Sequence, residues 1–389
     1  MSVLSNDHQG VFISPAQRDN GSVTDIHVPA DLLPDDGRFG SGPSRIRRQQ
    51  AADLASAAQS VLGTSHRKDP VLSLVGSVRE RLATLFSLPN DWTVVLGNGG
   101  ASTFWDVASF GLIRERSQHL VFGEFSQKFA DIVTACPHLE PPVVVSSIAG
   151  SVPEFVEADE VDTVCLTHNE TSTGARADLA HDPSAALFVV DATSAAGALP
   201  FSHHDADVYY FSPQKAFGAD GGTWFALCSP RAIDRNAELR DRWTPPSLDL
   251  ATAIDSSRKN QTYNTPAIAT LVLINSQLGW MLDQGGLEWC VSRVQESADI
   301  VYRWAESSTY ATPFVDNPRH RSPVVATIDL HDVPCDELNA VLRRNGIVDT
   351  ESYRKLGRNQ IRIGLFPSVE PSDVHKLTNA IDYVVERLS

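Results

Sequence analysis

Short apolar runs alternate with longer mixed stretches through the first two thirds of the chain. The runs are rich in valine, phenylalanine and tyrosine, and several end at glycine, aspartate or asparagine. Runs of this kind, bounded by turn residues, are typical of β-strands buried on both faces. The strands predicted in this way are Thr93–Leu96, His119–Phe122, Val143–Val145, Thr163–Leu166, Leu187–Val190, Val208–Phe211 and Trp224–Leu227.

Helix-length segments separate several of these runs, with Val71–Ser87 and Ala101–Leu112 as the clearest examples. Strands that alternate with helices predict an α/β layer around a mostly parallel sheet. We therefore expect an α/β fold with a mostly parallel seven-stranded sheet in a large domain.

From about Thr265 the pattern changes to long helices and fewer strands. The last helix, which Ser372 is expected to cap, repeats apolar residues at helical spacing. The predicted elements are the helices Ala267–Trp280, Leu287–Ser307 and Asp336–Asn345, the strands Val324–Leu330 and Gln360–Gly364, and the helix after Ser372. We divide the chain into an N-terminal tail and lead-in segment (1–36), a large domain (37–283) and a smaller α+β C-terminal domain (284–389).

Composition narrows the class of protein. The 389 residues include 32 Lys+Arg and 48 Asp+Glu, a formal net charge of −16, which argues against nucleic acid as a partner. The five cysteines are scattered without a CxxC pair, so neither a zinc site nor a disulfide framework is expected. The N-terminus lacks the features of a secretory signal, and no apolar run reaches the roughly 18 residues of a membrane span. We expect a cytoplasmic protein without membrane contact.

Two residues at the ends of neighbouring predicted strands point to a specific chemistry. Asp191 ends the run Leu187–Val190, and Lys215 follows the aromatic strand Val208–Phe211 in a glycine-rich turn. Ligands in α/β sheets bind beyond the carboxyl ends of the strands. A desolvated lysine forms Schiff bases, and pyridoxal phosphate (PLP) enzymes pair such a lysine with a carboxylate for the ring nitrogen. The alternative for Asp191 alone is a residue that caps the following turn.

A phosphate site is indicated by Gly97-Asn98-Gly99-Gly100, where a strand turns into a helix that begins at Ala101-Ser102. Backbone N–H groups at a helix N-terminus bind phosphate. A dinucleotide-binding turn is the competing interpretation. It fails because Ser102 stands where the third glycine belongs and no acidic residue matches the expected position after the next strand.

Two further segments suit a planar ring. Phe125 follows a predicted strand and is placed to stack on the ring, although a core phenylalanine is the commoner outcome. The segment His168–Gly174 also follows a strand, and its hydroxyl groups suit a ring oxygen. Its alternative is a polar turn with a helix cap.

Taken together, these residues resemble the phosphoserine aminotransferase family, a group of class V aminotransferases on the fold-type I PLP scaffold. The resemblance extends over nearly the whole chain and is strongest to the actinobacterial branch. The motifs that carry it are Asn169-Glu170-Thr171, Asp191, Ser212-Pro213-Gln214-Lys215 and Asn264-Thr265-Pro266.

The resemblance implies a role for each matching residue. Lys215 would hold PLP as a Schiff base, and Asp191 would pair with the pyridinium nitrogen. Thr171 would bond the ring oxygen and Phe125 would stack. The phosphate would be held by Ala101, Ser102 and Gln214 and, from the second subunit of a homodimer with shared active sites, by Asn264 and Thr265.

Substrate-binding residues are implied in the same way. His66-Arg67 matches a His-Arg pair of the family, and Arg362 matches the arginine that grips the substrate α-carboxylate. Many members carry a further His-Arg for the substrate phosphate, where this chain has Tyr353-Arg354-Lys355. We assign Arg354 and Lys355 to that phosphate, with a solvated basic loop that includes Arg358 as the alternative.

The implied reaction is transamination between L-glutamate and 3-phosphohydroxypyruvate, which gives 2-oxoglutarate and O-phospho-L-serine in serine biosynthesis. Pyridoxine biosynthesis is a further role found in the family. Rival functions are an alanine–glyoxylate type aminotransferase, a cysteine desulfurase with Cys335 as its late cysteine, and a non-catalytic PLP-binding regulator.

Overall fold

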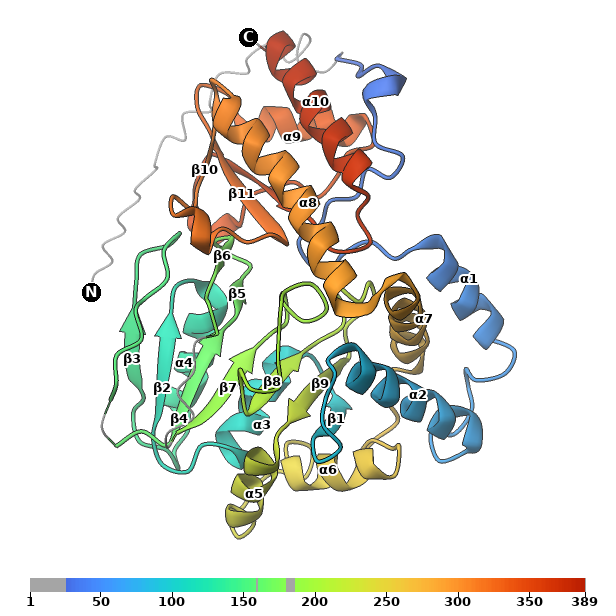
Figure 1. Ribbon diagram of the computed structural model, residues 1–389, viewed down its shortest axis with the longest axis vertical. Helices are drawn as coiled ribbons and strands as arrows, with labels where there is room; N and C mark the ends of the chain where they lie inside the picture. Colours follow the sequence, from blue (N-terminus) through green and yellow to red (C-terminus); the bar gives the residue numbers. More distant parts are fainter. Residues whose placement is uncertain (1–25, 159, 180–185, 389) are drawn as a thin grey trace, which may run out of the picture.

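The computed structural model describes residues 26–158, 160–179 and 186–388 (Figure 1). A large sheet with helices on both faces lies beside a smaller sheet that packs with the C-terminal helices. The predicted α/β class and the seven-stranded, mostly parallel sheet are confirmed. Most of the predicted N-terminal tail falls on residues 1–25 and lies outside the described residues.

All seven predicted strands join the large sheet. Strand β9 is antiparallel to both of its neighbours, β1 and β8, whereas the other adjacent pairs are parallel. The carboxyl ends of the parallel strands therefore meet at one edge of the sheet, where α/β proteins place their ligands. The order is β1 (Thr93–Asn98), β9 (Thr223–Cys228), β8 (Val208–Phe211), β7 (Leu187–Asp191), β4 (Thr163–Thr167), β2 (Ser117–Val121) and β3 (Val143–Ser146).

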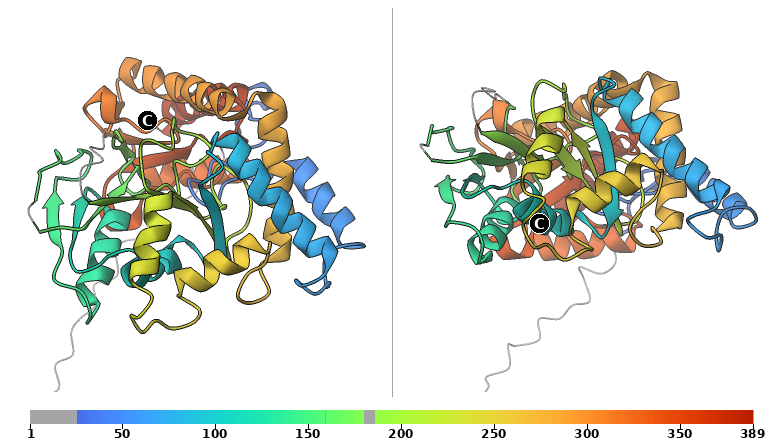
Figure 2. Two further views of the ribbon diagram at one scale, coloured as in Figure 1. Left: turned by 60° about the horizontal axis from the view of Figure 1, so that its bottom comes forward. Right: turned by 90° about the horizontal axis from the view of Figure 1, so that it is seen from below.

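Helices cover both faces of this sheet because successive apolar strand residues point to opposite sides. In β1, Val95 packs with one layer while Val94 and Leu96 pack with the other. The first layer contains α3 (Ala101–Gly111), α4 (Glu124–Ala135), α5 (Pro230–Glu238) and α6 (Leu250–Arg258). The second contains α2 (Asp69–Leu85) and α7 (Ile268–Gln284), with α1 (Arg48–Ala57) against α7 (Figure 2).

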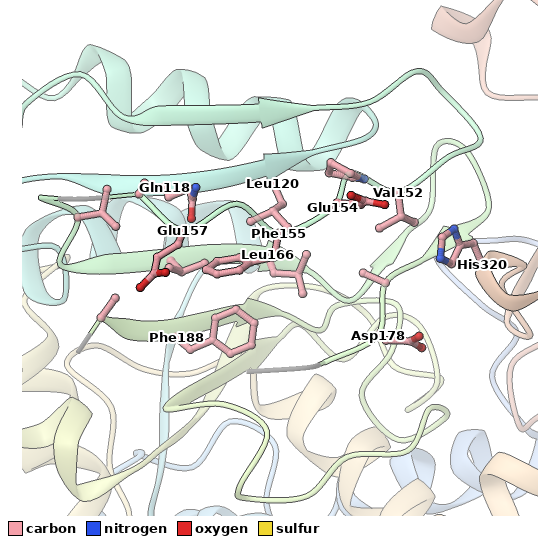
Figure 3. Close-up of a pocket in the computed structure, with 16 residues that line it drawn as sticks. Gln118, Leu120, Val152, Glu154, Phe155, Glu157, Leu166, Asp178, Phe188 and His320 are labelled. Atoms are coloured by element: carbon pink, nitrogen blue, oxygen red, sulfur yellow. The ribbon is translucent and has the colours of Figure 1, made fainter. Parts of the chain in front are cut away.

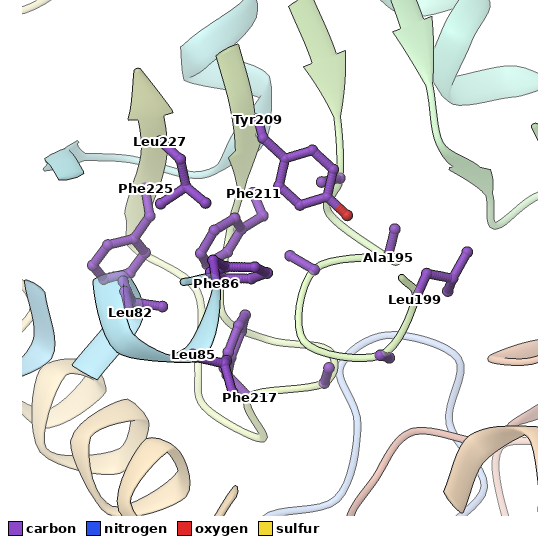
Figure 4. Close-up of a cluster of buried hydrophobic side chains, with 14 of the residues drawn as sticks. Leu82, Leu85, Phe86, Ala195, Leu199, Tyr209, Phe211, Phe217, Phe225 and Leu227 are labelled. Carbon is purple, nitrogen blue, oxygen red and sulfur yellow. The ribbon is translucent and has the colours of Figure 1, made fainter. Parts of the chain in front are cut away.

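An aromatic cluster beneath the sheet anchors the turn that follows β8 (Figure 4). Phe217 is 1% exposed and stacks on Phe211 of β8 with ring centroids 5.0 Å apart. Phe211 in turn stacks on Phe225 of β9. Since Phe217 lies two residues after Lys215, burial of this ring fixes the position of the lysine-bearing turn.

The C-terminal part forms a second hydrophobic core around an antiparallel sheet. Val28 and Phe39, from the start of the described chain, also belong to this core. Helix α8 serves both cores, with Val294 in the first and Val301 in the second. The elements are α8 (Gly286–Ser307), β10 (Ala311–Pro313), β11 (Val325–Leu330), α9 (Cys335–Arg344), β12 (Gln360–Gly364) and α10 (Pro371–Leu388). The domain boundaries at 36/37 and 283/284 stay predictions.

Two predictions about local structure are wrong. Strand β3 is not buried on both faces, because it lies at the sheet edge and Val144 is 45% exposed. Ser372 does not cap the last helix. The helix begins one residue earlier at Pro371, whose missing N–H and fixed φ suit the first helical position.

The remaining described elements are short. They comprise the hairpin strands β5 (Asn169–Glu170) and β6 (Ala175–Arg176), and the 3₁₀ segments η2 (Ala30–Leu32), η3 (Pro318–His320) and η4 (Arg354–Leu356). Within the described residues, no helix has both the length and the apolar character needed to span a bilayer.

Candidate active site

Lys215 lies at the carboxyl edge of the large sheet, where its side chain is 7% exposed. Its Nζ donates hydrogen bonds to Thr171 Oγ1 and to Ser194 Oγ, each at 2.7 Å. Thr171 and Ser194 also bond to each other. The amine is therefore held between two hydroxyl groups from different strand-end turns. Ser194 was not predicted, although its place three residues after Asp191 was a usable signal.

Burial strongly disfavours the charged form of this amine. Desolvation lowers the pKa of Lys215 to about 7, against the raising influence of the Asp191 and Glu170 carboxylates. The guanidinium of Arg362 lowers this pKa further. Near neutral pH, a large fraction of Lys215 is thus the free amine, which is the nucleophilic form.

Asp191 ends β7 and is 5% exposed. Its Oδ2 accepts a hydrogen bond from the Trp105 indole Nε1 at 3.2 Å, and its Oδ1 accepts one from the Thr193 backbone at 2.9 Å. Both donors are neutral, so they orient the carboxylate without neutralising its charge. Trp105 comes from α3 and was missed because no sequence pattern links residues 86 positions apart.

Thr171 and Phe125 flank the lysine amine. The Nζ of Lys215 lies 5.5 Å from the centroid of the Phe125 ring, and 2.7 Å from Thr171 Oγ1. Phe125 is half-buried in the first turn of α4, and Thr171 follows the short strand β5. The structure thus brings together Lys215, Asp191, Thr171 and Phe125, as predicted from four separate segments.

The glycine turn before α3 lies at the position where the sequence predicts a phosphate site. A Cβ on Gly97 would lie 2.2 Å from the Trp224 ring, and Gly99 has φ +105°. Both positions therefore require glycine. Ala101 and Ser102 open α3, whose first backbone N–H groups have no partner within the helix. Gln214, next to Lys215, has a buried Oε1 without a hydrogen-bond partner.

Arg362 reaches the same site from β12 of the smaller sheet. Its Nη1 donates to the backbone oxygen of Thr171 at 3.2 Å, and its guanidinium lies 5.3 Å from the Tyr353 ring centroid. Burial lowers the pKa of Arg362 from its ordinary value. Its buried Nε has no partner among the described residues, which leaves a donor available for an anion.

The other cations predicted for the substrate phosphate differ in their surroundings. Lys355 is exposed and forms an ion pair with Glu124, which raises its pKa. Arg358 pairs with Asp329 and lies 4.6 Å from the Phe314 ring centroid. Arg354 is exposed in η4. The structure therefore favours a structural role for Arg358.

The segments that carry His66-Arg67 and Asn264-Thr265 meet in the single chain through His66 and Thr265. Thr265 Oγ1 and His66 Nδ1 are 3.1 Å apart, and the Thr265 backbone oxygen accepts a hydrogen bond from Asn98 at 2.8 Å. Arg67, Asn264 and Thr265 are exposed. Among the described residues, none of the four shares a hydrogen bond with Lys215, Asp191 or Thr171.

A pocket of about 730 Å³, lined by both apolar and polar side chains, lies elsewhere on the sheet (Figure 3). Leu120, Leu166 and Phe188, from β2, β4 and β7, form its floor, and Phe155 covers part of it. None of the predicted site residues lines this pocket. Its lining offers no nucleophile activated by a neighbouring base, so the chemistry assigns the site to Lys215 and not to this cavity.

Comparison with known proteins agrees with this assignment. Residues 153–350 match the family Aminotransferase class-V. The phosphoserine aminotransferase of Rhodococcus opacus is 54% identical over 366 residues, which cover 93% of this chain and 98% of the relative. That of Nocardioides sp. is 54% identical over 370 residues, which cover 93% and 99%. The chain belongs to the phosphoserine aminotransferase family.

Solved structures of phosphoserine aminotransferases have the same fold as this chain. The protein from Cytophaga hutchinsonii superposes with a TM-score of 0.81 at 24% identity and covers 89% of this chain and 99% of its own. The protein from Bacillus circulans subsp. alkalophilus gives 0.80 at 19% identity, with coverage of 91% and 99%. The fold-type I scaffold inferred from the sequence is confirmed.

The residues present fit the cofactor that aminotransferases use. Buried polar atoms normally find partners, yet Thr193 Oγ1, Gln214 Oε1 and Arg362 Nε have none among the described residues. All three belong to the segments around Lys215. The Arg362 Nε–H and the Thr193 hydroxyl are donors that suit the oxygen atoms of a bound ligand, and the buried amine of Lys215 suits the aldehyde of PLP.

Proposed function

We propose that this chain uses PLP to transfer the amino group of L-glutamate to 3-phosphohydroxypyruvate, which gives 2-oxoglutarate and O-phospho-L-serine. The observation that carries the proposal is the buried amine of Lys215, with a pKa of about 7, in one site with Asp191, Thr171 and Arg362. The relatives at 54% identity support the same reaction. A role in serine biosynthesis follows from it, and one in pyridoxine biosynthesis stays a prediction.

Each part of the cofactor would have its own residues. Lys215 would hold the aldehyde carbon, Asp191 the ring nitrogen, Thr171 the ring oxygen and Phe125 the ring face. Ala101, Ser102 and Gln214 would hold the phosphate. When bound, PLP supplies an aldehyde that condenses with amines and a ring that accepts electrons from Cα.

Proton transfer in this reaction falls to Lys215. Its Nζ, once free, would be the base that takes up the Cα proton of the bound amino acid and later releases it. A pKa near neutrality suits this task, because the amine must both accept and release the proton. Asp191 would pair with the protonated ring nitrogen of PLP, and the Trp105 and Thr193 donors hold its carboxylate in one orientation.

The anionic groups of the substrates would be bound by arginine and lysine side chains near Lys215. A guanidinium grips a carboxylate with two hydrogen bonds, which suits Arg362 to the α-carboxylate that both substrates share. Arg354 and Lys355 are proposed for the phosphate. His66 and Arg67 complete the proposed substrate-binding set.

We also propose a homodimer with shared active sites. Asn264 and Thr265 are exposed and apart from Lys215 in the single chain, which is expected if they complete the phosphate site of a second copy. Tyr263, beside them, is 46% exposed, and an aromatic residue of this kind is common at protein interfaces.

The rival functions receive less support. A desulfurase needs a cysteine that reaches the substrate, whereas Cys335 is 6% exposed, bonds Gln360 and packs in the second core. Burial also raises its pKa, which disfavours the reactive thiolate. An alanine–glyoxylate type enzyme would need no phosphate-binding cation such as Arg354.

A keto-acid panel with glutamate as donor tests the proposal. The value of kcat/KM for 3-phosphohydroxypyruvate should exceed those for pyruvate and glyoxylate by roughly a hundredfold or more, since a site built for a charged group rejects analogues without it. Comparable values for all three acids would contradict the proposed substrate. Lys215→Ala should abolish turnover with every acid, and turnover at the native rate would remove Lys215 from the site.

A further inference from the structure

A buried carboxylate that the proposed reaction does not use lies next to Thr171. Glu170 is 0% exposed. Its Oε2 accepts hydrogen bonds from the backbone N–H of Phe125 at 3.1 Å and of Ser126 at 2.9 Å. Its Oε1 accepts from the backbone of Ser172 at 3.2 Å and from its hydroxyl at 2.6 Å. Surroundings composed of donors suit a carboxylate, which only accepts.

These bonds connect two elements of the site. The N–H groups of Phe125 and Ser126 belong to the first turn of α4, where a helix leaves its donors without internal partners. Glu170 supplies those partners from the last position of β5, directly before the turn that carries Thr171. One side chain thus fixes the distance between α4 and the turn.

Helix α4 and the turn after β5 are closely packed against each other. A Cβ on Gly123, the residue before α4, would lie 2.3 Å from Glu170 Cγ and 2.6 Å from Ser172 Oγ. Ser172 Oγ also accepts a hydrogen bond from the Glu124 backbone at 2.9 Å. Any other arrangement of the Glu170 side chain would break contacts on both sides.

We propose that Glu170 is a positioning residue, which holds α4 against the turn after β5 and thereby fixes Phe125 and Thr171 about Lys215. The inference rests on the proposed function, since these two positions matter only if the site binds PLP. Phe125 and Thr171 lie 5.5 Å (ring centroid) and 2.7 Å (Oγ1) from the Lys215 amine. A shift of α4 would move the ring without moving the lysine.

The charge of Glu170 also acts on the amine. Glu170 and Asp191 raise the pKa of Lys215, whereas burial and Arg362 lower it. Replacement of Glu170 by glutamine should therefore lower the pKa of the Lys215 nitrogen. This effect gives the experiment a signal that loss of fold stability alone does not produce.

The test compares Glu170→Gln with the wild type and with Asp131→Asn, a matched change on the exposed side of α4. In Glu170→Gln, the amide N–H₂ would face N–H donors. We expect the Kd for PLP to rise about tenfold and the pH titration of the bound cofactor's absorbance to move to lower pH. Asp131→Asn should match the wild type in both. The melting temperature without PLP is measured in parallel.

The inference would be overturned if Glu170→Gln had the wild-type Kd for PLP and the wild-type pH titration of absorbance. Glu170 would then have a purely structural role, even if the melting temperature were lower. If Glu170→Gln does not fold, Ser172→Ala tests the inference instead, because it removes only one hydroxyl group that bonds Glu170. It should raise the Kd for PLP about fivefold, and a wild-type Kd would overturn the inference. If the wild type itself binds no PLP, the proposed function fails instead.

Discussion

Lys215 is buried, and a reactive amine at this position must also be uncharged. Its two hydrogen-bond acceptors, Thr171 and Ser194, are hydroxyl groups, which are compatible with both conditions. Thr171 and Ser194 accept hydrogen bonds from the amine but carry no charge, so they place Nζ without stabilising its protonated form as an adjacent carboxylate would. The lowered pKa of Lys215 follows mainly from burial. A residue-scale prediction follows from this pKa.

Modification of Lys215 in the PLP-free protein should follow its lowered pKa. The free amine reacts and the protonated amine does not, so reductive methylation of Lys215 should reach half its maximal rate near pH 7. Exposed lysines, with an ordinary pKa of about 10.4, should continue to gain reactivity well above that pH. Peptide mass spectrometry measures the modification of each lysine. A half-maximal rate for Lys215 near pH 10 would show that burial does not control this amine.

At the scale of elements, the segment 351–358 connects the small sheet to helix α4. The Lys355–Glu124 ion pair ties it to α4, and the Arg358–Asp329 pair ties it to β11. Two residues before Lys355, the Tyr353 ring lies 6.2 Å from the Phe125 ring, measured between centroids. The ion pairs partly neutralise the charges of Lys355 and Arg358. Among the described residues, Arg354 has no ion-pair partner.

Arg354 should therefore contribute more to recognition of the substrate phosphate than its neighbours. Arg354→Ala should raise the KM for 3-phosphohydroxypyruvate by roughly ten- to a hundredfold, the effect of losing a charge-assisted hydrogen bond. Lys355→Ala should raise it less, and Arg358→Ala should leave it near the wild-type value. Steady-state kinetics with the keto acid varied measure all three. An order in which Arg358→Ala has the largest effect would assign the phosphate to Arg358.

At the scale of the whole molecule, one buried ion pair joins the segment before α1 to the last helix. Arg45 Nη1 lies 3.0 Å from Asp373 Oδ2, with side-chain exposures of 6% and 2%. The adjacent Ser44 donates from its backbone to Gln214 at 2.8 Å, next to Lys215. The pair thus links α10 to the segment that packs beside the lysine-bearing turn.

Arg45→Met should lower the free energy of unfolding by about 3–5 kcal/mol, because it leaves the Asp373 carboxylate buried without its partner. The double variant Arg45→Met/Asp373→Leu should recover most of that loss, since it leaves no unpaired charge. Denaturant titration followed by circular dichroism measures both. The exposed Arg258→Met should change the value by at most about 0.5 kcal/mol. A double variant as unstable as the single one would mean that the pair itself provides the stability.

Local patterns in the sequence determined the strands, most long helices and the positions of Asp191 and Lys215 after strand ends. Strand β12 was predicted at its observed bounds, Gln360–Gly364, because its alternation and turns are local signals. Asp191 and Lys215 were found because strand ends in a parallel sheet meet at one edge, a rule that needs only the order of strands. The polar helix α5 was not predicted, since it has few apolar residues to form a periodic pattern.

The tertiary structure alone decided how these residues are held. The contacts of Asp191 with Trp105, of Glu170 with Phe125 and of Arg45 with Asp373 span 86, 45 and 328 positions. No local pattern encodes such pairs, because their partners are chosen by packing of whole elements. Burial is equally a tertiary property, and it is burial that lowers the pKa of Lys215 to about 7 at the carboxyl edge of the sheet.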